Sequence, residues 1–251
     1  MVRVIMHGCN GKMGQVITNL AAGDDGIEIV AGIDAYNRKE NTYPVFGSLE
    51  ECTVEADAII DFANAAAVDG LLEYSLRRQI PVVVCTTGLS QEQIEKIHET
   101  SKNVAVLFSY NMSLGINMLL KLLKEASRVL APAGFDMEIV ERHHNQKMDA
   151  PSGTAIALAD SINEALGNEY EYKYDRSGER KKRDKKEIGM HAVRGGTIVG
   201  EHEVIFAGTD EVIEFQHKAY SKSVFGKGAV QAAKFLAGKP AGLYTMADVI
   251  G

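Results

Sequence analysis

The sequence lacks any apolar run approaching the ~18 residues of a membrane-spanning helix, which argues against a transmembrane protein. The chain also lacks an excess of positive charge: it has 27 Lys and Arg against 34 Asp and Glu, and the resulting formal net charge of -7 argues against a general nucleic-acid binder. Cysteine is scarce, because Cys9, Cys52 and Cys85 are an odd, widely spaced trio. The N-terminus leads directly into an expected strand without a signal-peptide pattern. These features together predict a reduced, cytoplasmic compartment.

Internal repeats and low-complexity segments are absent as well, so the chain is expected to be globular. It has 251 residues, of which 45% are hydrophobic. That length suits one large domain or two modest ones, and that composition can bury a proper core.

A glycine-rich turn follows the first expected strand, Val2 to Met6. Its spacing is Gly-x-x-Gly-x-x-Gly, where the usual fingerprint is Gly-x-Gly-x-x-Gly, and a helical pattern continues to Gly23. A second strand, Glu28 to Ile33, ends in an acid suited to the ribose hydroxyls of an adenosine. This order predicts a dinucleotide-binding βαβ unit. The residues expected to bind the cofactor here are Gly8, Cys9, Asn10, Gly11, Lys12, Met13, Gly14 and Asp34.

The alternation of strands and helices continues to about residue 112. Strands are expected at 57–62, 81–85 and 104–108, with helices at 65–78 and, after a Ser90 and Gln93 capping box, to about 101. In an open parallel sheet, ligands bind beyond the carboxyl ends of the strands. Further cofactor contacts are therefore expected at Phe62, Cys85, Thr86, Thr87, Gly88, Ser109, Tyr110, Asn111 and Met112. Taken singly, these polar loop residues also fit plain turn chemistry.

After Ser113 the pattern changes to one long helix, 114–130, followed mainly by strands. The strands are expected at 137–140, 170–174, 191–193, 197–206 and 211–218. The charged segment 175–187 is expected to be a solvated loop. The prediction is an α/β protein with a doubly wound parallel sheet at 1–112, an α+β domain at 113–221, and a tail at 222–251 that returns to the first domain.

The densest chemistry lies between Glu141 and Ala155. Pro151 suits a first helical position, so a helix is expected to start near Ser152, with free N–H groups that suit an anion. A carboxylate is expected on Ser152, Gly153 and Thr154, beside His143, His144 and Lys147 in a loop after the extended run 136–141. An ordinary capped helix with a polar loop is the alternative. No metal site is expected, because adjacent histidines rarely bind one ion and there is no His-x-x-x-His pattern or cysteine partner. A serine hydrolase is not expected either, because Ser152 does not lie in a Gly-x-Ser-x-Gly turn.

The chain resembles the dihydrodipicolinate reductase family of bacterial lysine synthesis over essentially its whole length. The resemblance rests on the turn at 8–14 and on the stretches 85–88, 109–117, 143–155 and 194–202, of which 143–155 is highly specific.

The resemblance implies a Rossmann domain completed by the C-terminal tail, a substrate domain between the two parts, and a homotetramer formed through the substrate-domain sheets. It also implies a reaction in which hydride passes from NADH or NADPH to a cyclic dicarboxylate while water is lost. His143 then resembles the acid/base residue and Lys147 the proton donor. His144 and residues 152–154 match the positions that hold the substrate carboxylates.

One departure concerns cofactor choice. Many relatives place Arg after the acid of the second strand, where this chain has Ala35, so we expect use of both cofactors with a lean to NADH. Compensation is possible, because Lys12 lies in the glycine turn and Arg38 and Lys39 follow the second strand, and one well-placed cation could offset most of the repulsion. Two other classes stay open: a different two-domain nicotinamide dehydrogenase of amino-acid metabolism, and a non-catalytic NAD-binding redox sensor.

Overall fold

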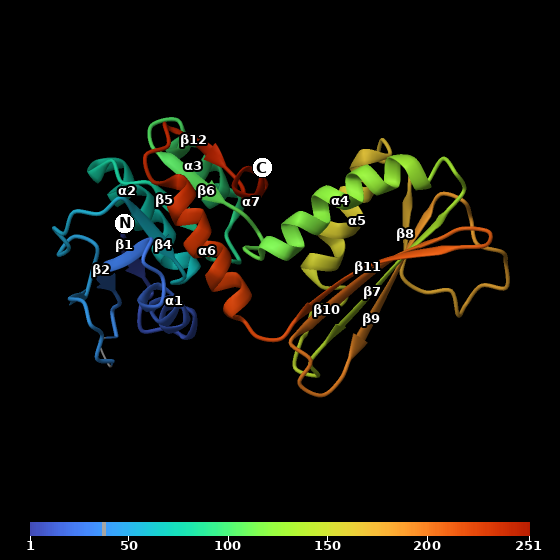
Figure 1. Cartoon of the computed structure of the whole chain (residues 1–251), viewed down its shortest axis with the longest axis horizontal. Coiled ribbons are helices and arrows are strands. Elements are labelled where there is room, and N and C mark those ends of the chain that lie inside the picture. The colour runs from blue at the N-terminus through green and yellow to red at the C-terminus, as the bar shows by residue number, and fades with distance from the viewer. Residues whose placement is uncertain (37–38) are drawn as a thin grey trace. The chain divides into compact units, whose positions relative to one another are not determined.

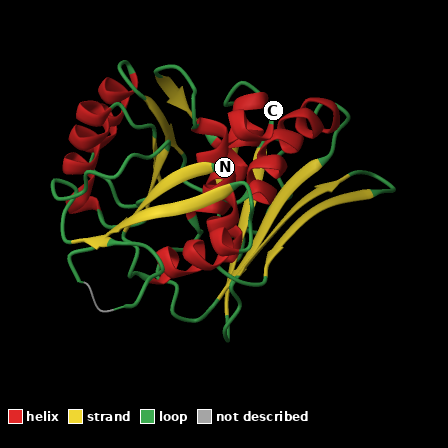
Figure 2. Ribbon diagram, turned by 60° about the vertical axis from the view of Figure 1, so that its left-hand side comes forward, coloured by secondary structure: helices red, strands yellow, loops and turns green. Residues whose placement is uncertain are grey.

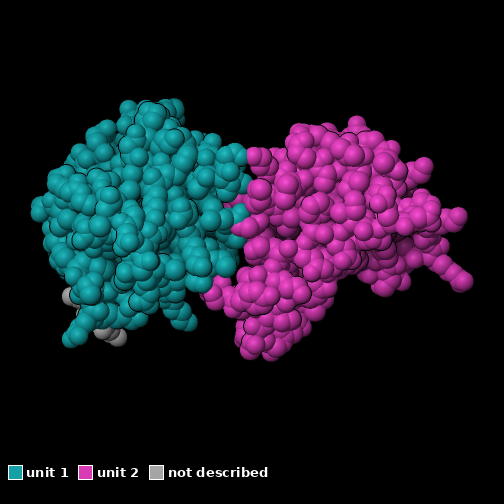
Figure 3. Space-filling view, viewed as in Figure 1, with its two compact units in different colours: residues 1–114, 223–251 teal, residues 115–222 magenta. Residues whose placement is uncertain are grey.

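Two units make up the chain in the computed structural model, which describes residues 1–36 and 39–251. One unit contains residues 1–114 and 223–251, and the other contains residues 115–222 (Figure 3). Arg38, expected above to assist cofactor binding, lies outside the described residues. Within the ranges described, no helix is both long and apolar enough to cross a membrane.

The first unit is built on a seven-stranded parallel sheet with the order β12-β6-β5-β4-β1-β2-β3. Its strands are β1 (Val2–His7), β2 (Ile27–Ile33), β3 (Val45–Phe46), β4 (Ala58–Asp61), β5 (Val82–Val84), β6 (Ala105–Phe108) and β12 (Gly242–Tyr244). Its helices are α1 (Lys12–Ala22), the short η1 (Ala65–Ala67), α2 (Val68–Arg78), α3 (Gln91–Ser101), α6 (Ser223–Leu236) and α7 (Met246–Ile250). The chain reverses its direction of travel along the sheet between β1 and β4, and this is the position where such folds bind ligands.

Alternation along β1 divides the core of this unit into two layers. Val4 and Met6 point to the layer that contains α1 and α6, whereas Ile5 points to the layer that contains α2 and α3. Helices therefore cover both faces of the sheet (Figure 1), as a buried parallel sheet requires. The C-terminal segment contributes α6 to one layer and β12 to the sheet edge beside β6.

The second unit has a mixed sheet with the order β11-β10-β7-β9-β8. Its strands are β7 (Asp136–His143), β8 (Glu171–Lys173), β9 (Glu187–Arg194), β10 (Gly200–Ala207) and β11 (Val212–Ala219), and its helices are α4 (Leu114–Leu130) and α5 (Gly153–Ala165). Both helices pack on one face of the sheet (Figures 1 and 2), where Leu123, Leu158, Ile139 and Phe206 form the core. The predicted fold class, a Rossmann-type sheet plus an α+β unit, is confirmed.

Local details differ from the expectation around the histidines. β7 extends to His143, so this residue ends a strand instead of lying in a loop. Ser152 is the N-cap of α5 and Gly153 is its first residue, so Pro151 precedes the helix instead of opening it. The segment 175–187 is more than a solvated loop, because Arg183 pairs with Asp136 and Glu138. These pairs attach the segment to β7.

Candidate functional site

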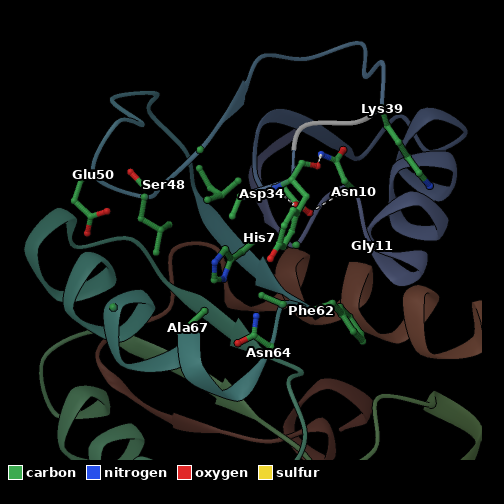
Figure 4. Close-up of a pocket in the computed structure, with 18 residues that line it drawn as sticks. His7, Asn10, Gly11, Asp34, Lys39, Ser48, Glu50, Phe62, Asn64 and Ala67 are labelled. Atoms are coloured by element: carbon green, nitrogen blue, oxygen red, sulfur yellow. Dashed lines mark hydrogen bonds between the residues drawn. The ribbon is translucent and has the colours of Figure 1, made fainter.

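A cavity of about 620 Å³ lies at the carboxyl ends of β1, β2 and β4 (Figure 4). The predicted cofactor residues that line it are Gly8, Asn10, Gly11, Asp34 and Phe62. The carboxylate of Asp34 accepts hydrogen bonds from the backbone N–H groups of Asn10 and Tyr36, each at 2.9 Å. The acid is thus fixed beside the glycine turn.

The glycine turn itself leaves no room for side chains. Gly8 has a φ of +81°, and a Cβ on it would lie 2.7 Å from the carbonyl oxygen of Phe62. A Cβ on Gly14 would collide with the carbonyl oxygens of Gly8 and Cys9. The first turn of α1, which carries Lys12 and Met13, can therefore approach a diphosphate closely.

A second, smaller cavity of about 250 Å³ follows β5 and β6. The structure brings together there the predicted residues Thr86, Thr87, Gly88, Ser109 and Tyr110. Asn111 lies in the same loop, where its side-chain oxygen accepts from the N–H of Ser113.

Three of the predicted cofactor residues have side chains in the core: Cys9, Cys85 and Met112. Burial, with a smaller contribution from Asp34, raises the pKa of Cys9 to about 11. Burial likewise raises the pKa of Cys85 well above its usual value. These positions therefore offer a ligand their main chain and not their side chains.

The first cavity also contains a residue that sequence reasoning missed. His7 ends β1, and its Nδ1 lies 2.8 Å from Oδ1 of the fully buried Asp61 at the end of β4. The two are register partners on neighbouring strands. Sequence reasoning could have paired His7 with Asp61, because both lie at the carboxyl ends of expected strands of the same parallel sheet.

In the second unit, the polar cluster is centred on Glu141. Its carboxylate lies 2.6 Å from Nδ1 of His143 and accepts two hydrogen bonds from Arg194, both at 2.7 Å. It also accepts from the N–H of Ser152 at 3.0 Å. Sequence reasoning assigned no role to Glu141 or Arg194, although both lie in or beside the stretches on which the family resemblance rests.

The N–H and the hydroxyl of Ser152 both form hydrogen bonds within the protein. Its hydroxyl oxygen accepts from the N–H of Ala155 and lies 3.1 Å from Nε2 of His202. Burial, then the neighbouring His143, lowers the pKa of His202 to about 3. His202 is therefore neutral and shares a hydrogen bond with the Ser152 hydroxyl. Ser152 caps the helix and orders the cluster, while Gly153 is exposed and Thr154 partly exposed.

Lys147 lies just before the N-terminus of α5. Its Nζ pairs with Oδ1 of Asp149 at 2.8 Å. The hydrogen bond from Lys147, together with the N–H of Gly153, lowers the pKa of Asp149 against the opposing effect of its slight burial. This part of the unit thus already holds one carboxylate, between an ammonium and the start of a helix.

His144 follows β7 directly, and its buried Nδ1 makes no hydrogen bond with the described part of the chain. Within residues 1–36 and 39–251, no group of three or more His, Cys, Asp or Glu side chains is placed to hold a metal ion.

Comparison with known proteins gives a consistent result. The family described as dihydrodipicolinate reductase, N-terminus, matches residues 2–112, and its C-terminus counterpart matches residues 115–250. The 4-hydroxy-tetrahydrodipicolinate reductase of Caldanaerobacter subterraneus subsp. tengcongensis is 53% identical over 100% of this chain and 98% of its own length. A dipicolinate-bound dihydrodipicolinate reductase from Paenisporosarcina sp. TG-14 superposes with a TM-score of 0.84 at 24% identity, covering 100% of both chains. A scyllo-inositol dehydrogenase from Lactobacillus casei with bound NAD(H) gives a TM-score of 0.63 at 13% identity, covering 100% of this chain and 93% of its own.

Proposed function

The chain belongs to the dihydrodipicolinate reductase family, and from this we propose that it reduces 4-hydroxy-tetrahydrodipicolinate to tetrahydrodipicolinate. A hydride and a proton are added and water is lost, in the diaminopimelate branch of lysine synthesis. The observation that carries the substrate class is the carboxylate of Asp149, held between Lys147 and the first N–H of α5. A substrate carboxylate has the same charge and shape. We also propose a cytoplasmic location, since Cys9, Cys52 and Cys85 are all free thiols.

In the second unit, some residues are proposed to bind the dicarboxylate and others to exchange protons with it. Gly153 and Thr154 receive one carboxylate at the start of α5, and His144 contributes its buried nitrogen. His143 exchanges protons through Nε2, because Nδ1 is engaged with Glu141. Lys147 offsets the negative charge of the ring and donates a proton to it.

The first unit fits a nicotinamide dinucleotide. The crowded glycine turn permits close approach of a diphosphate to α1, and Asp34 is placed for the hydroxyls of the adenosine ribose. When bound, the nicotinamide supplies the hydride. The loops that carry Thr86 to Gly88 and Ser109 to Met112 are proposed to surround the nicotinamide and its ribose.

We expect the protein to use NADH at least as well as NADPH. A 2′-phosphate would bring negative charge against Asp34, and Ala35 supplies no cation. Lys39, which lines the same cavity as Asp34, and the exposed Lys12 at the start of α1 are cations that can compensate. Lys12→Ala should therefore reduce kcat/KM with NADPH more than with NADH, and added salt should weaken use of NADPH first.

Coupled oxidation of NADH and of NADPH, with the product of the preceding synthase step as substrate, tests both the function and the cofactor choice. Absence of turnover with either cofactor would contradict the function. A strong NADPH preference that survives Lys12→Ala would contradict only the electrostatic account of cofactor choice.

A Gly153→Val variant should raise KM for the dicarboxylate with little change in NADH affinity. A Cβ at this position meets nothing within 4 Å, so the fold should tolerate valine while the side chain blocks the anion from the helix N–H groups. Gly178→Val, also in open space but in the charged loop, is the control. Normal KM with lost NADH binding would move this segment to the cofactor site.

The second unit supports a further proposal, that the protein is a homotetramer formed through its mixed sheet. The sheet face opposite α4 and α5 includes Val140, Val193 and Ile205, which register places on one side. Val193 is 44% exposed, so this part of the face is accessible to a partner subunit. Sedimentation equilibrium of the whole protein tests this proposal.

A further inference from the structure

We infer that Glu141 is a positioning residue for the reaction: it fixes which nitrogen of His143 carries the proton and ties that histidine to the helix that receives the substrate carboxylate. The inference rests on the proposed function for the identity of the acid/base residue. The contacts that carry it lie entirely within the second unit.

Glu141 is 1% exposed and its two oxygens are shared among three partners. Oε2 faces Nδ1 of His143 at 2.6 Å and Nη1 of Arg194 at 2.7 Å. Oε1 accepts from Nη2 of Arg194 at 2.7 Å and from the N–H of Ser152 at 3.0 Å. A two-pronged arginine contact of this kind fixes the plane of the carboxylate as well as its position.

The carboxylate stays ionised in this setting. Burial alone would raise the pKa of Glu141, but the hydrogen bonds from Arg194 and His143 hold it below its usual value. An ionised carboxylate only accepts hydrogen bonds, so Nδ1 of His143 must carry the proton that it donates. Nε2 is then the nitrogen left to take up or release a proton.

The other groups around His143 do not compete for this role. The ring of His202 lies edge-on to His143 with centroids 5.1 Å apart, and it is neutral because its pKa is about 3. Arg194 is a cation, which donates and does not accept. Glu141 is therefore the acceptor that selects the tautomer of His143.

The same carboxylate also holds the start of α5. Ser152, the N-cap of α5, donates its N–H to Glu141, while Arg194 donates to the carbonyl oxygen of Asp149 at 2.5 Å. The Glu141–Arg194 pair thus fixes both ends of the segment 149–152. The acid/base nitrogen and the carboxylate site are positioned by one buried ion pair.

Glu141→Gln tests the inference, with Glu138→Gln as the matched control. Glu138 lies on the same strand but on the opposite face, where it contacts Nε2 of His191 at 2.8 Å and Nε of Arg183 at 3.0 Å. Both variants remove one charge from a Glu–His–Arg cluster. Only the first should lower kcat, by about 10²-fold, the lower end of the range for lost general acid–base help.

Two readouts separate positioning from a loss of stability. Long-range ¹H–¹⁵N spectra of the His143 imidazole should show the proton on Nδ1 in the wild type and a shift toward Nε2 in Glu141→Gln. The pH profile of kcat should change in Glu141→Gln and stay as in the wild type in Glu138→Gln. Should Glu141→Gln fail to fold, Glu141→Asp keeps the charge beside Arg194 but withdraws it from His143, and the same shift is expected.

An unchanged His143 tautomer in the folded variant would overturn the inference, as would a kcat loss that Glu138→Gln reproduces. A wild-type protein without dicarboxylate turnover would instead overturn the proposed function. The imidazole spectra would then still decide the role of Glu141 in selecting the tautomer.

Discussion

Lys147→Ala is expected to lower kcat by about 10²–10⁴-fold while leaving NADH affinity nearly unchanged. The ammonium is proposed to act on the reacting ring, and the dinucleotide cavity lies in the other unit, at the ends of β1, β2 and β4. The variant also frees Asp149, whose pKa is held down mainly by its hydrogen bond to Lys147. Steady-state kinetics with the dicarboxylate, together with NADH titration by fluorescence, measures the two effects separately.

A matched control exists in the same unit. Lys173 has a side chain 23% exposed, against 22% for Lys147, and it too pairs with one carboxylate, that of Glu179 at 2.5 Å. Lys173→Ala should retain wild-type kcat. Lys147→Arg keeps the charge but replaces a group that can release its proton with one that stays protonated. Recovery of kcat in Lys147→Arg would show that charge alone suffices, and near wild-type kcat in Lys147→Ala would remove the assigned role altogether.

Elements specified by neighbouring residues were predicted accurately. The helix expected at 114–130 is α4 with the same bounds, since its apolar residues recur at helical spacing until the Ala-Pro-Ala-Gly stop. The Ser90 and Gln93 capping box is present with both of its hydrogen bonds. β3 and β12 were missed because they have only two and three residues and lack the continuous apolar run that marks the similarly short β5.

The site could be predicted only in part, because its side chains are held by residues that lie far away in the sequence. The expected strand stopped at Glu141 because a carboxylate and an imidazole ordinarily lie outside a core. Both are buried here, Glu141 against Arg194, 53 residues away in the chain, and His143 against Glu141. The role of Ser152 changed for the same reason: its helix-cap geometry was visible locally, but its contacts with Glu141 and His202 were not.

The charged segment shows the limit of composition as a guide. Mixed signs over 175–187 indicated a solvated loop, yet Arg176 and Arg183 converge on Glu138. Their partner lies on β7, on the face opposite the acid/base cluster. The sheet register decides which charged side chains pair, and the register cannot be read from the sequence of the segment itself.

Gly14→Ala is expected to weaken NADH binding by about 10- to 10²-fold. The added Cβ would collide with backbone oxygens of Gly8 and Cys9, so either α1 or the glycine turn must move. Overpacking typically costs ~1–3 kcal/mol, and each ~1.4 kcal/mol is a tenfold change in affinity when it falls on the bound state. Here the moved atoms are the ones that would cradle the diphosphate, so binding is affected as well as stability.

Gly23→Ala at the other end of α1 is the control for the same chemical change. Its Cβ would lie 3.8 Å from the carbonyl oxygen of Leu20, an ordinary contact, so both NADH affinity and thermal stability should stay near wild type. Circular dichroism establishes that each variant is folded, and fluorescence titration gives the NADH dissociation constant. A folded Gly14→Ala that binds NADH like the wild type would show that the dinucleotide does not rest on this turn, because no binding mode with the diphosphate against α1 survives the displacement of that backbone.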